Sequence, residues 1–188
     1  MEQSTNGISK GNGAVQSNIQ TLLKRARRDV EDGMVTDGYA PDRKAVIKLL
    51  NEALATELVC VLRYKRHFSM ATVIHSDAIK AEFLAHATEE MSHADRLARR
   101  IVELGGVPNF SPERLRARSN AEYAPGDTLS SMIKKDLIAE RISIESYREM
   151  IAFLADHDPT TGRMLKEILA SEERHAADLV SLIAGMNS

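Results

Sequence analysis

The chain has 188 residues, of which 43% are hydrophobic and 28% are charged, and its formal net charge at pH 7 is −2. The length fits one domain with short additions, and so small a net charge excludes a strong bulk attraction to nucleic acid or to anionic lipid. The single cysteine excludes an internal disulfide. No apolar run approaches the roughly 18 residues of a membrane span, and residues 1–15 lack the apolar core of a signal peptide. We therefore expect a cytoplasmic protein with no membrane partner.

The first 41 residues are expected to lie outside the main fold. Residues 1–17 are rich in glycine and asparagine and predict a flexible tail. Residues 18–41 predict a short basic amphipathic helix, over 18–31, and a linker that contains two glycines and a proline. Residues 1–28 carry five basic side chains and one acidic one, so this arm is a candidate DNA-binding segment. The alternative, which we prefer, is an amphipathic helix docked on the assembled protein with its basic side in water.

Residues 42–188 are expected to form one bundle of four long helices, because apolar side chains recur at spacings of three and four residues. Aromatic residues make up only 4% of the chain and strong helix formers dominate, which favours an all-α fold. Ser76 is the expected N-cap of the second helix, and Asp158 followed by Pro159 marks the start of the fourth. The predicted helices are residues 42–70, 77–104, 129–154 and 158–184.

The connection between the second and third predicted helices is unusually long. Residues 105–127 begin with two glycines, contain three prolines and lack a hydrophobic period. A helix of about 26 residues is roughly 39 Å long, and an extended connection of this length spans that distance. The segment can therefore return along the whole bundle and leave the second and third helices parallel, which is a four-helix bundle with one long crossover.

Two of the predicted helices carry the same motif, a glutamate followed three residues later by a histidine. The two copies are Glu90-Met-Ser-His93 and Glu172-Glu-Arg-His175. Residues three apart project from the same face of a helix. Each of the other two helices places a single glutamate, Glu57 or Glu140, within its apolar stripe. Two such pairs and two single carboxylates are the inward ligands of a di-metal centre in a four-helix bundle.

Charge supports the same interpretation. A solvated or salt-bridged pair is the ordinary explanation for one such motif, but burying several carboxylates costs several kcal/mol each unless they are paired or bind metal. Two divalent ions neutralise four glutamates, and carboxylate with imidazole suits iron or manganese better than thiophilic metals. His86 and Asp136 also lie near the predicted inner faces, so not every polar residue there need be a ligand.

Five stretches resemble the bacterioferritin branch of the ferritin-like superfamily. They are residues 50–58, 89–95, 102–109, 136–140 and 171–175. The resemblance implies a ferroxidase that binds Fe(II) at a di-iron centre, oxidises it with O2 or H2O2, stores ferric mineral in a hollow homo-oligomeric cage and protects against oxidative stress. The implied ligands are Glu57, Glu90, His93, Glu140, Glu172 and His175.

The resemblance also bears on three flanking residues. Tyr64 matches a tyrosine that donates an electron to the iron centre; the alternative is a core tyrosine with its hydroxyl on a carboxylate. Met91 matches a haem-ligating methionine, yet it projects about 100° away from Glu90, and we prefer simple packing to an intersubunit haem. His86 and Glu89 could line an inner iron route, and we prefer a solvated or salt-bridged role for them.

Two departures from the bacterioferritin pattern concern assembly. The chain ends 13 residues after His175 and places about 40 residues before the first bundle helix. The family's 24-subunit shell uses a fifth helix that this chain has no room for, so the resemblance favours the twelve-subunit cage of Dps-like proteins with a bacterioferritin-type centre in each subunit. The alternatives are a Dps-type protein that also binds DNA through its N-terminal arm, and a di-metal peroxidase or manganese catalase that stores no iron.

Overall fold

The computed structural model describes residues 19–186 apart from 28–33, 37, 40 and 74–76. The predicted flexible tail and the predicted Ser76 cap lie outside these described residues. All regular structure in the described part is helical. The helices are α1 (Ile19–Ala26), α2 (Arg43–Val73), α3 (Asp77–Glu103), α4 (Leu115–Arg118), α5 (Leu129–Leu154) and α6 (Pro159–Met186).

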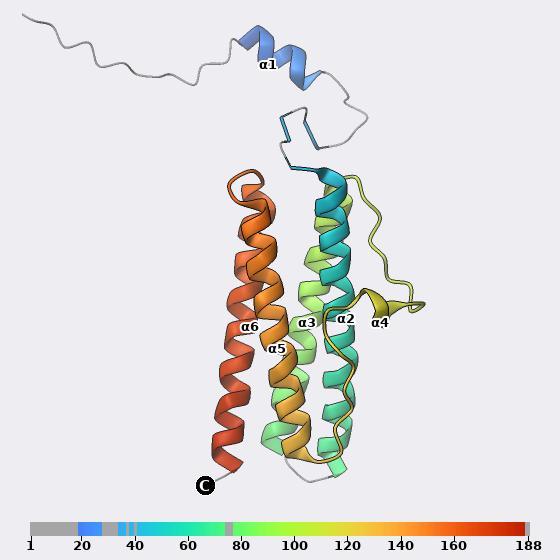
Figure 1. Ribbon diagram of the computed structural model, residues 1–188, viewed down its shortest axis with the longest axis vertical. Helices are drawn as coiled ribbons and strands as arrows, with labels where there is room; N and C mark the ends of the chain where they lie inside the picture. Colours follow the sequence, from blue (N-terminus) through green and yellow to red (C-terminus); the bar gives the residue numbers. More distant parts are fainter. Residues whose placement is uncertain (1–18, 28–33, 37, 40, 74–76, 187–188) are drawn as a thin grey trace, which may run out of the picture.

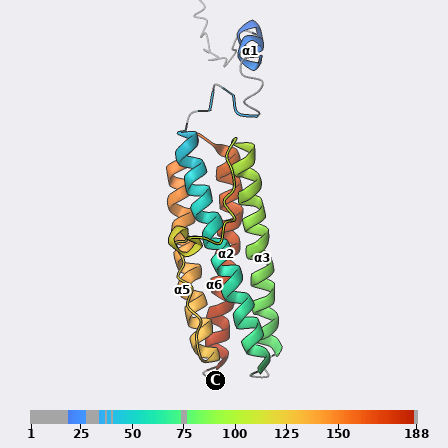
Figure 2. The same ribbon diagram turned by 90° about the vertical axis from the view of Figure 1, so that its right-hand side faces the viewer.

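Helices α2, α3, α5 and α6 run side by side as a four-helix bundle, as the two views in Figures 1 and 2 show. The most extensive packing is between α2 and α3 and between α5 and α6, so the bundle consists of two antiparallel hairpins. The segment that joins the hairpins starts at one end of the bundle and reaches the other, which leaves α3 and α5 parallel. The predicted all-α bundle with one long crossover is therefore confirmed.

The short helices lie outside the bundle core. The predicted N-terminal helix is present as α1, every residue of which is exposed, and it lies beyond one end of the bundle in both views. Helix α4 interrupts the crossover and was not predicted. It follows Arg114, whose backbone is left-handed (φ 58°). Because α4 has only four residues, it is too short to show a helical period in the sequence.

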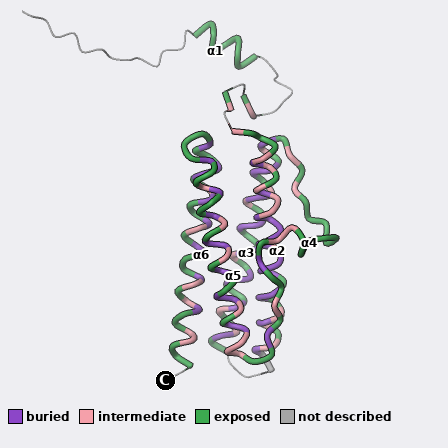
Figure 3. Tube along the Cα trace, in the orientation of Figure 1, coloured by how far each residue is buried: buried purple, intermediate pink, exposed green. Residues whose placement is uncertain are grey.

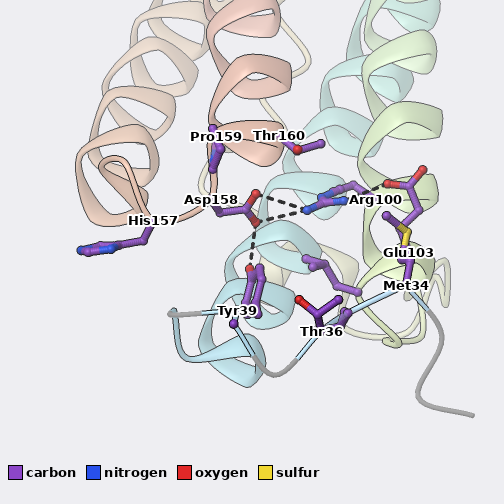
Figure 4. Close-up of a pocket in the computed structure, with 12 residues that line it drawn as sticks. Met34, Thr36, Tyr39, Arg100, Glu103, His157, Asp158, Pro159 and Thr160 are labelled. Atoms are coloured by element: carbon purple, nitrogen blue, oxygen red, sulfur yellow. Dashed lines mark hydrogen bonds and ion pairs between the residues drawn. The ribbon is translucent and has the colours of Figure 1, made fainter. Parts of the chain in front are cut away.

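A buried carboxylate fixes the start of α6 and joins three segments at that end of the bundle (Figure 4). Asp158 accepts a hydrogen bond from the backbone N–H of Thr161 at 2.9 Å, as the predicted N-cap should. Both its oxygens lie 3.2 Å from Nη2 of Arg100 on α3. The hydroxyl of Tyr39, in the linker before α2, donates to Asp158 Oδ2 at 2.8 Å. The linker is thus attached to the bundle through the same side chain that caps α6.

A second buried network holds the crossover against α2 and α5. Arg63 Nε donates to Asp136 Oδ1 at 2.7 Å, and His67 Nδ1 lies 2.7 Å from the other Asp136 oxygen. The same two α2 side chains reach the crossover, because Arg63 Nη1 donates to the Glu122 carbonyl at 3.1 Å and His67 Nε2 lies 2.8 Å from the Pro125 carbonyl. Asp136 therefore balances a buried arginine, which explains a polar residue on an inner face without any ligand role.

Apolar side chains fill the bundle above and below a polar layer in its middle. One cluster includes Leu50, Leu97 and Leu165, and the other includes Phe83 and Ile133. Figure 3 shows the buried positions along the inward sides of the four long helices. None of the helices in the described part of the chain combines the length and apolar character that a bilayer span requires.

Candidate metal centre

Six side chains from all four long helices meet in the polar layer between the two apolar clusters. They are Glu57 from α2, Glu90 and His93 from α3, Glu140 from α5, and Glu172 and His175 from α6. Each is at most 4% exposed. The structure therefore brings together all six residues for which the sequence predicts a ligand role.

These side chains form two overlapping groups of potential metal ligands. The first group is Glu57, Glu90, His93 and Glu172, and the second is Glu90, Glu140, Glu172 and His175. Within each group, one ligand atom from every residue lies within 4.8 Å of the others. Glu90 and Glu172 belong to both groups, so each is in position to bridge two ions.

The two histidines lie at corresponding places in the two groups. His93 Nδ1 lies 2.9 Å from Glu172 Oε1 and 3.4 Å from Glu57 Oε2. His175 Nδ1 lies 3.8 Å from Glu140 Oε2. Glu90 turns one oxygen toward each imidazole, with Oε2 3.3 Å from His93 Nδ1 and Oε1 3.3 Å from His175 Nδ1.

The atoms that face one another here have unsatisfied bonding capacity. Within the described part of the chain, seven of them are buried and have no hydrogen-bond partner: Glu57 Oε2, both oxygens of Glu90, His93 Nδ1, Glu140 Oε2, Glu172 Oε1 and His175 Nδ1. A buried polar atom without a partner costs about 1–3 kcal/mol. Oxygen and imidazole nitrogen donors concentrated in this way fit a pair of divalent first-row cations.

The four glutamates divide into two with raised and two with lowered pKa values. Burial, together with the Glu90 charge, raises the pKa of Glu57 to about 8, and burial with the same neighbour raises that of Glu172 well above its ordinary value. Burial and the Glu140 charge oppose ionisation of Glu90, but the neighbouring Glu57, His175 and His93 side chains stabilise its carboxylate and hold its pKa below the ordinary value. Glu140 has a lowered pKa because its hydrogen bonds similarly outweigh burial.

Both histidines favour the protonated form when protons alone balance the charge. Burial opposes the imidazolium, but Glu57 and Glu90 raise the pKa of His93 to about 10. In the same way, Glu140 and Glu90 raise the pKa of His175 to about 10. Together these directions favour two carboxylates, two carboxylic acids and two imidazolium ions, whose charges sum to zero.

Two tyrosines tie the hairpins together beside this layer. The hydroxyl of Tyr64 on α2 donates to Glu140 on α5, and the hydroxyl of Tyr147 on α5 donates to Glu57 on α2. Burial raises the pKa of both phenols, which keeps them protonated as donors. Tyr64 thus has its hydroxyl on a carboxylate, and its role as electron donor stays a prediction. The equivalent contact of Tyr147 was not predicted, although each tyrosine follows the glutamate of its own helix by seven residues.

Glu89 orients the ring of His175 from outside the layer. Its Oε2 lies 3.0 Å from His175 Nε2 and accepts a hydrogen bond from Ser171 at 2.9 Å. It also pairs with Arg174. A carboxylate on the second ring nitrogen fixes the orientation of a histidine ligand, so Glu89 has the salt-bridged role that we preferred from the sequence.

Met91 lies on the outer side of α3. It is 39% exposed, whereas Glu90 and His93 beside it are buried. Helix geometry predicts this direction, away from the six grouped side chains. Packing stays the preferred role of Met91, and an intersubunit haem stays the less favoured alternative.

Comparison with known proteins gives consistent matches. Residues 47–188 match the family of the ferritin-like domain. The chain is 30% identical over 141 residues to a bacterioferritin of Desulfovibrio desulfuricans, covering 73% of this chain and 74% of the relative. It is 30% identical over 131 residues to a bacterioferritin of Mycobacterium avium, covering 69% and 78%. A solved structure of a bacterioferritin-related protein from Bacteroides fragilis, characterised as a dodecameric thioferritin, matches with a TM-score of 0.69 and 30% identity over 89% of this chain and 96% of that one.

Proposed function

Because the chain belongs to the ferritin-like family, we propose that it is an iron-storage and detoxification protein with ferroxidase activity. The observation that carries the proposal is the pair of overlapping ligand groups that share Glu90 and Glu172. In this proposal two Fe(II) ions bind side by side. Their ligands are Glu57, Glu90, His93, Glu140, Glu172 and His175.

The charge of the site suits this substrate. Two Fe(II) ions offset the four ionised glutamates, and the histidines bind as neutral imidazoles. Each ion gives up one electron, and the two electrons with two protons reduce one O2 to H2O2 or one H2O2 to two waters. When Fe(III) leaves the glutamates, oxide and hydroxide formed from water balance all three of its charges and three protons per ion are released, which gives the composition of a ferric mineral, FeO(OH).

Storage requires a container that one bundle cannot supply. The twelve-subunit assembly of the Bacteroides fragilis protein supports a homo-oligomeric cage here, with mineral in its hollow interior. Leu62, Ile138 and Phe153 are each more than half exposed on the bundle surface, and large exposed apolar side chains are typical of contacts between protein copies. Such a protein protects against oxidative stress because it stores the iron and consumes the oxidant.

The ligand assignment is tested by the double variant Glu90→Ala/His93→Ala. It should abolish rapid Fe(II) oxidation, followed by absorbance, while circular dichroism and particle mass stay those of the wild type. The matched control is Glu145→Ala/Arg148→Ala, which removes an exposed pair three residues apart on α5 and should oxidise iron at the wild-type rate. Wild-type oxidation in the first variant contradicts the assignment.

Particle mass and metal content after aerobic Fe(II) addition separate storage from the alternative redox enzymes. Storage predicts hundreds of ferric ions per particle, whereas a di-metal peroxidase or manganese catalase retains about two ions per subunit. DNA binding stays the less favoured alternative. It is motivated by the exposed helix α1 with Lys24 and Arg25 in its last turn, and unchanged gel shifts after deletion of residues 1–28 would remove it.

A further inference from the structure

A third group of potential ligands lies outside the six residues of the candidate metal centre. Glu82 and His86 on α3 and Asp178 on α6 each place a ligand atom within 4.8 Å of the other two. His86 Nε2 lies 3.3 Å from Glu82 Oε1 and 3.7 Å from Asp178 Oδ2. The histidine is 2% exposed, whereas the two carboxylate side chains are 35% and 42% exposed.

The Nε2 atom of His86 points into this group without being satisfied by it. It is buried and has no hydrogen-bond partner among the described residues, although both carboxylates are near. If Nε2 is unprotonated, its lone pair faces two anionic oxygens. If Nε2 is protonated, its N–H group has no aligned acceptor. Either state leaves a buried polar atom unpaired, at a cost of about 1–3 kcal/mol.

We infer that Glu82, His86 and Asp178 bind one divalent first-row cation, Fe(II) or Mn(II), at a third site. A cation at Nε2 uses the lone pair, and its charge of +2 balances the two carboxylates. One imidazole with two carboxylates is a donor set that suits these metals. The partial exposure of both carboxylates leaves room for water to complete the coordination. The inference does not depend on the proposed function, because no ligand is shared.

The third site is connected to the candidate metal centre through the other face of His86. A metal on Nε2 leaves the proton on Nδ1, which lies 3.2 Å from the Tyr64 hydroxyl. Nδ1 then donates to Tyr64, and Tyr64 donates to Glu140. The His86 ring also stacks on that of His175, with centroids 4.1 Å apart. An ion at the third site therefore fixes the direction of a hydrogen-bond chain that ends on a predicted iron ligand.

The experiment uses Mn(II), which binds without oxidising in air at neutral pH. Crystals of the full chain soaked in Mn(II) should show an anomalous peak within bonding distance of His86 Nε2. Electron paramagnetic resonance of free Mn(II) should show that Glu82→Gln/Asp178→Asn binds one ion fewer per chain than the wild type. The control Asp95→Asn/Glu145→Gln removes the same charge at two other exposed positions and should bind as many ions as the wild type.

The third site and the proposed ligand assignment of the candidate metal centre would be contradicted by different results. No peak at His86 Nε2 in the wild type, or equal stoichiometry in Glu82→Gln/Asp178→Asn and the wild type, overturns the third site. Loss of one ion in the control as well would show that surface charge alone governs binding, and this also overturns it. A peak at His86 without ions between Glu90 and Glu172 rejects the proposed ligand assignment and supports the third site.

Discussion

Binding of two divalent cations at the candidate metal centre should release about four protons per chain at pH 7. Glu57 and Glu172 hold protons there because their pKa values are raised, that of Glu57 to about 8. His93 and His175 hold protons because their pKa values are about 10. Metal coordination needs carboxylates and neutral imidazoles, so each of these four groups gives up one proton.

The pH dependence of the metal affinity follows from this exchange of protons for metal ions. Four protons leave as two divalent ions enter, so the buried layer keeps a net charge of zero and its low dielectric does not oppose the exchange. With two protons displaced per ion, the affinity for each ion should rise about 100-fold per pH unit, or about 2.7 kcal/mol. The dependence should weaken above pH about 8, where Glu57 ionises without metal, and should weaken further above pH about 10, where the histidines are neutral.

Isothermal titration calorimetry measures the number of released protons. Mn(II) is titrated into Glu82→Gln/Asp178→Asn, so that only the candidate metal centre contributes, in two pH 7 buffers with different ionisation enthalpies. The dependence of the observed heat on buffer enthalpy should give about four protons per chain. A value near zero, or an affinity that does not change between about pH 6 and pH 8, would refute the assigned charge balance.

Two further predictions concern residues beside the centre. Tyr64→Phe and Tyr147→Phe should both bind as many Mn(II) ions as the wild type. Tyr64→Phe should slow Fe(II) oxidation more than Tyr147→Phe in stopped-flow absorbance, because Tyr64 is the predicted electron donor. Equal slowing in the two variants would show that Tyr64 acts only as a hydrogen-bond donor. Asp136→Ala should lower the free energy of unfolding in urea by about 3–5 kcal/mol, because Arg63 becomes an unpaired buried charge. Arg63→Met/Asp136→Leu should recover most of that loss, and a loss below about 1 kcal/mol in the single variant would contradict the role of the pair.

Much of the fold was predictable because local signals agree with the tertiary structure. The third long helix was predicted as residues 129–154 and is Leu129–Leu154, where Thr128 caps its first turn. Asp158 and Pro159 placed the start of α6 correctly. Helix α2 runs to Val73, three residues past the predicted end, because no glycine or proline marks a stop there. Helix α4 was missed because four residues carry no period.

The six clustered residues were predictable because they are ionisable residues within otherwise apolar helix stripes. Contacts between side chains of two different helices were not predictable, because they depend on how the helices are aligned. The bond from Tyr147 to Glu57 joins α5 to α2, and His86 meets Asp178 across α3 and α6. Helix periodicity gives the face of each residue but not its height relative to another helix, so such pairs need the packed structure.

The candidate metal centre is divided between the two hairpins of the bundle. The α2–α3 hairpin supplies Glu57, Glu90 and His93, and the other hairpin supplies the remaining three groups, so neither hairpin alone can surround a pair of ions. Each hairpin alone would expose charged groups within an otherwise apolar surface, so metal favours the docked state of the two hairpins. A ligand that binds only the docked state stabilises it by mass action, so a divalent cation at the candidate metal centre would hold the two hairpins together.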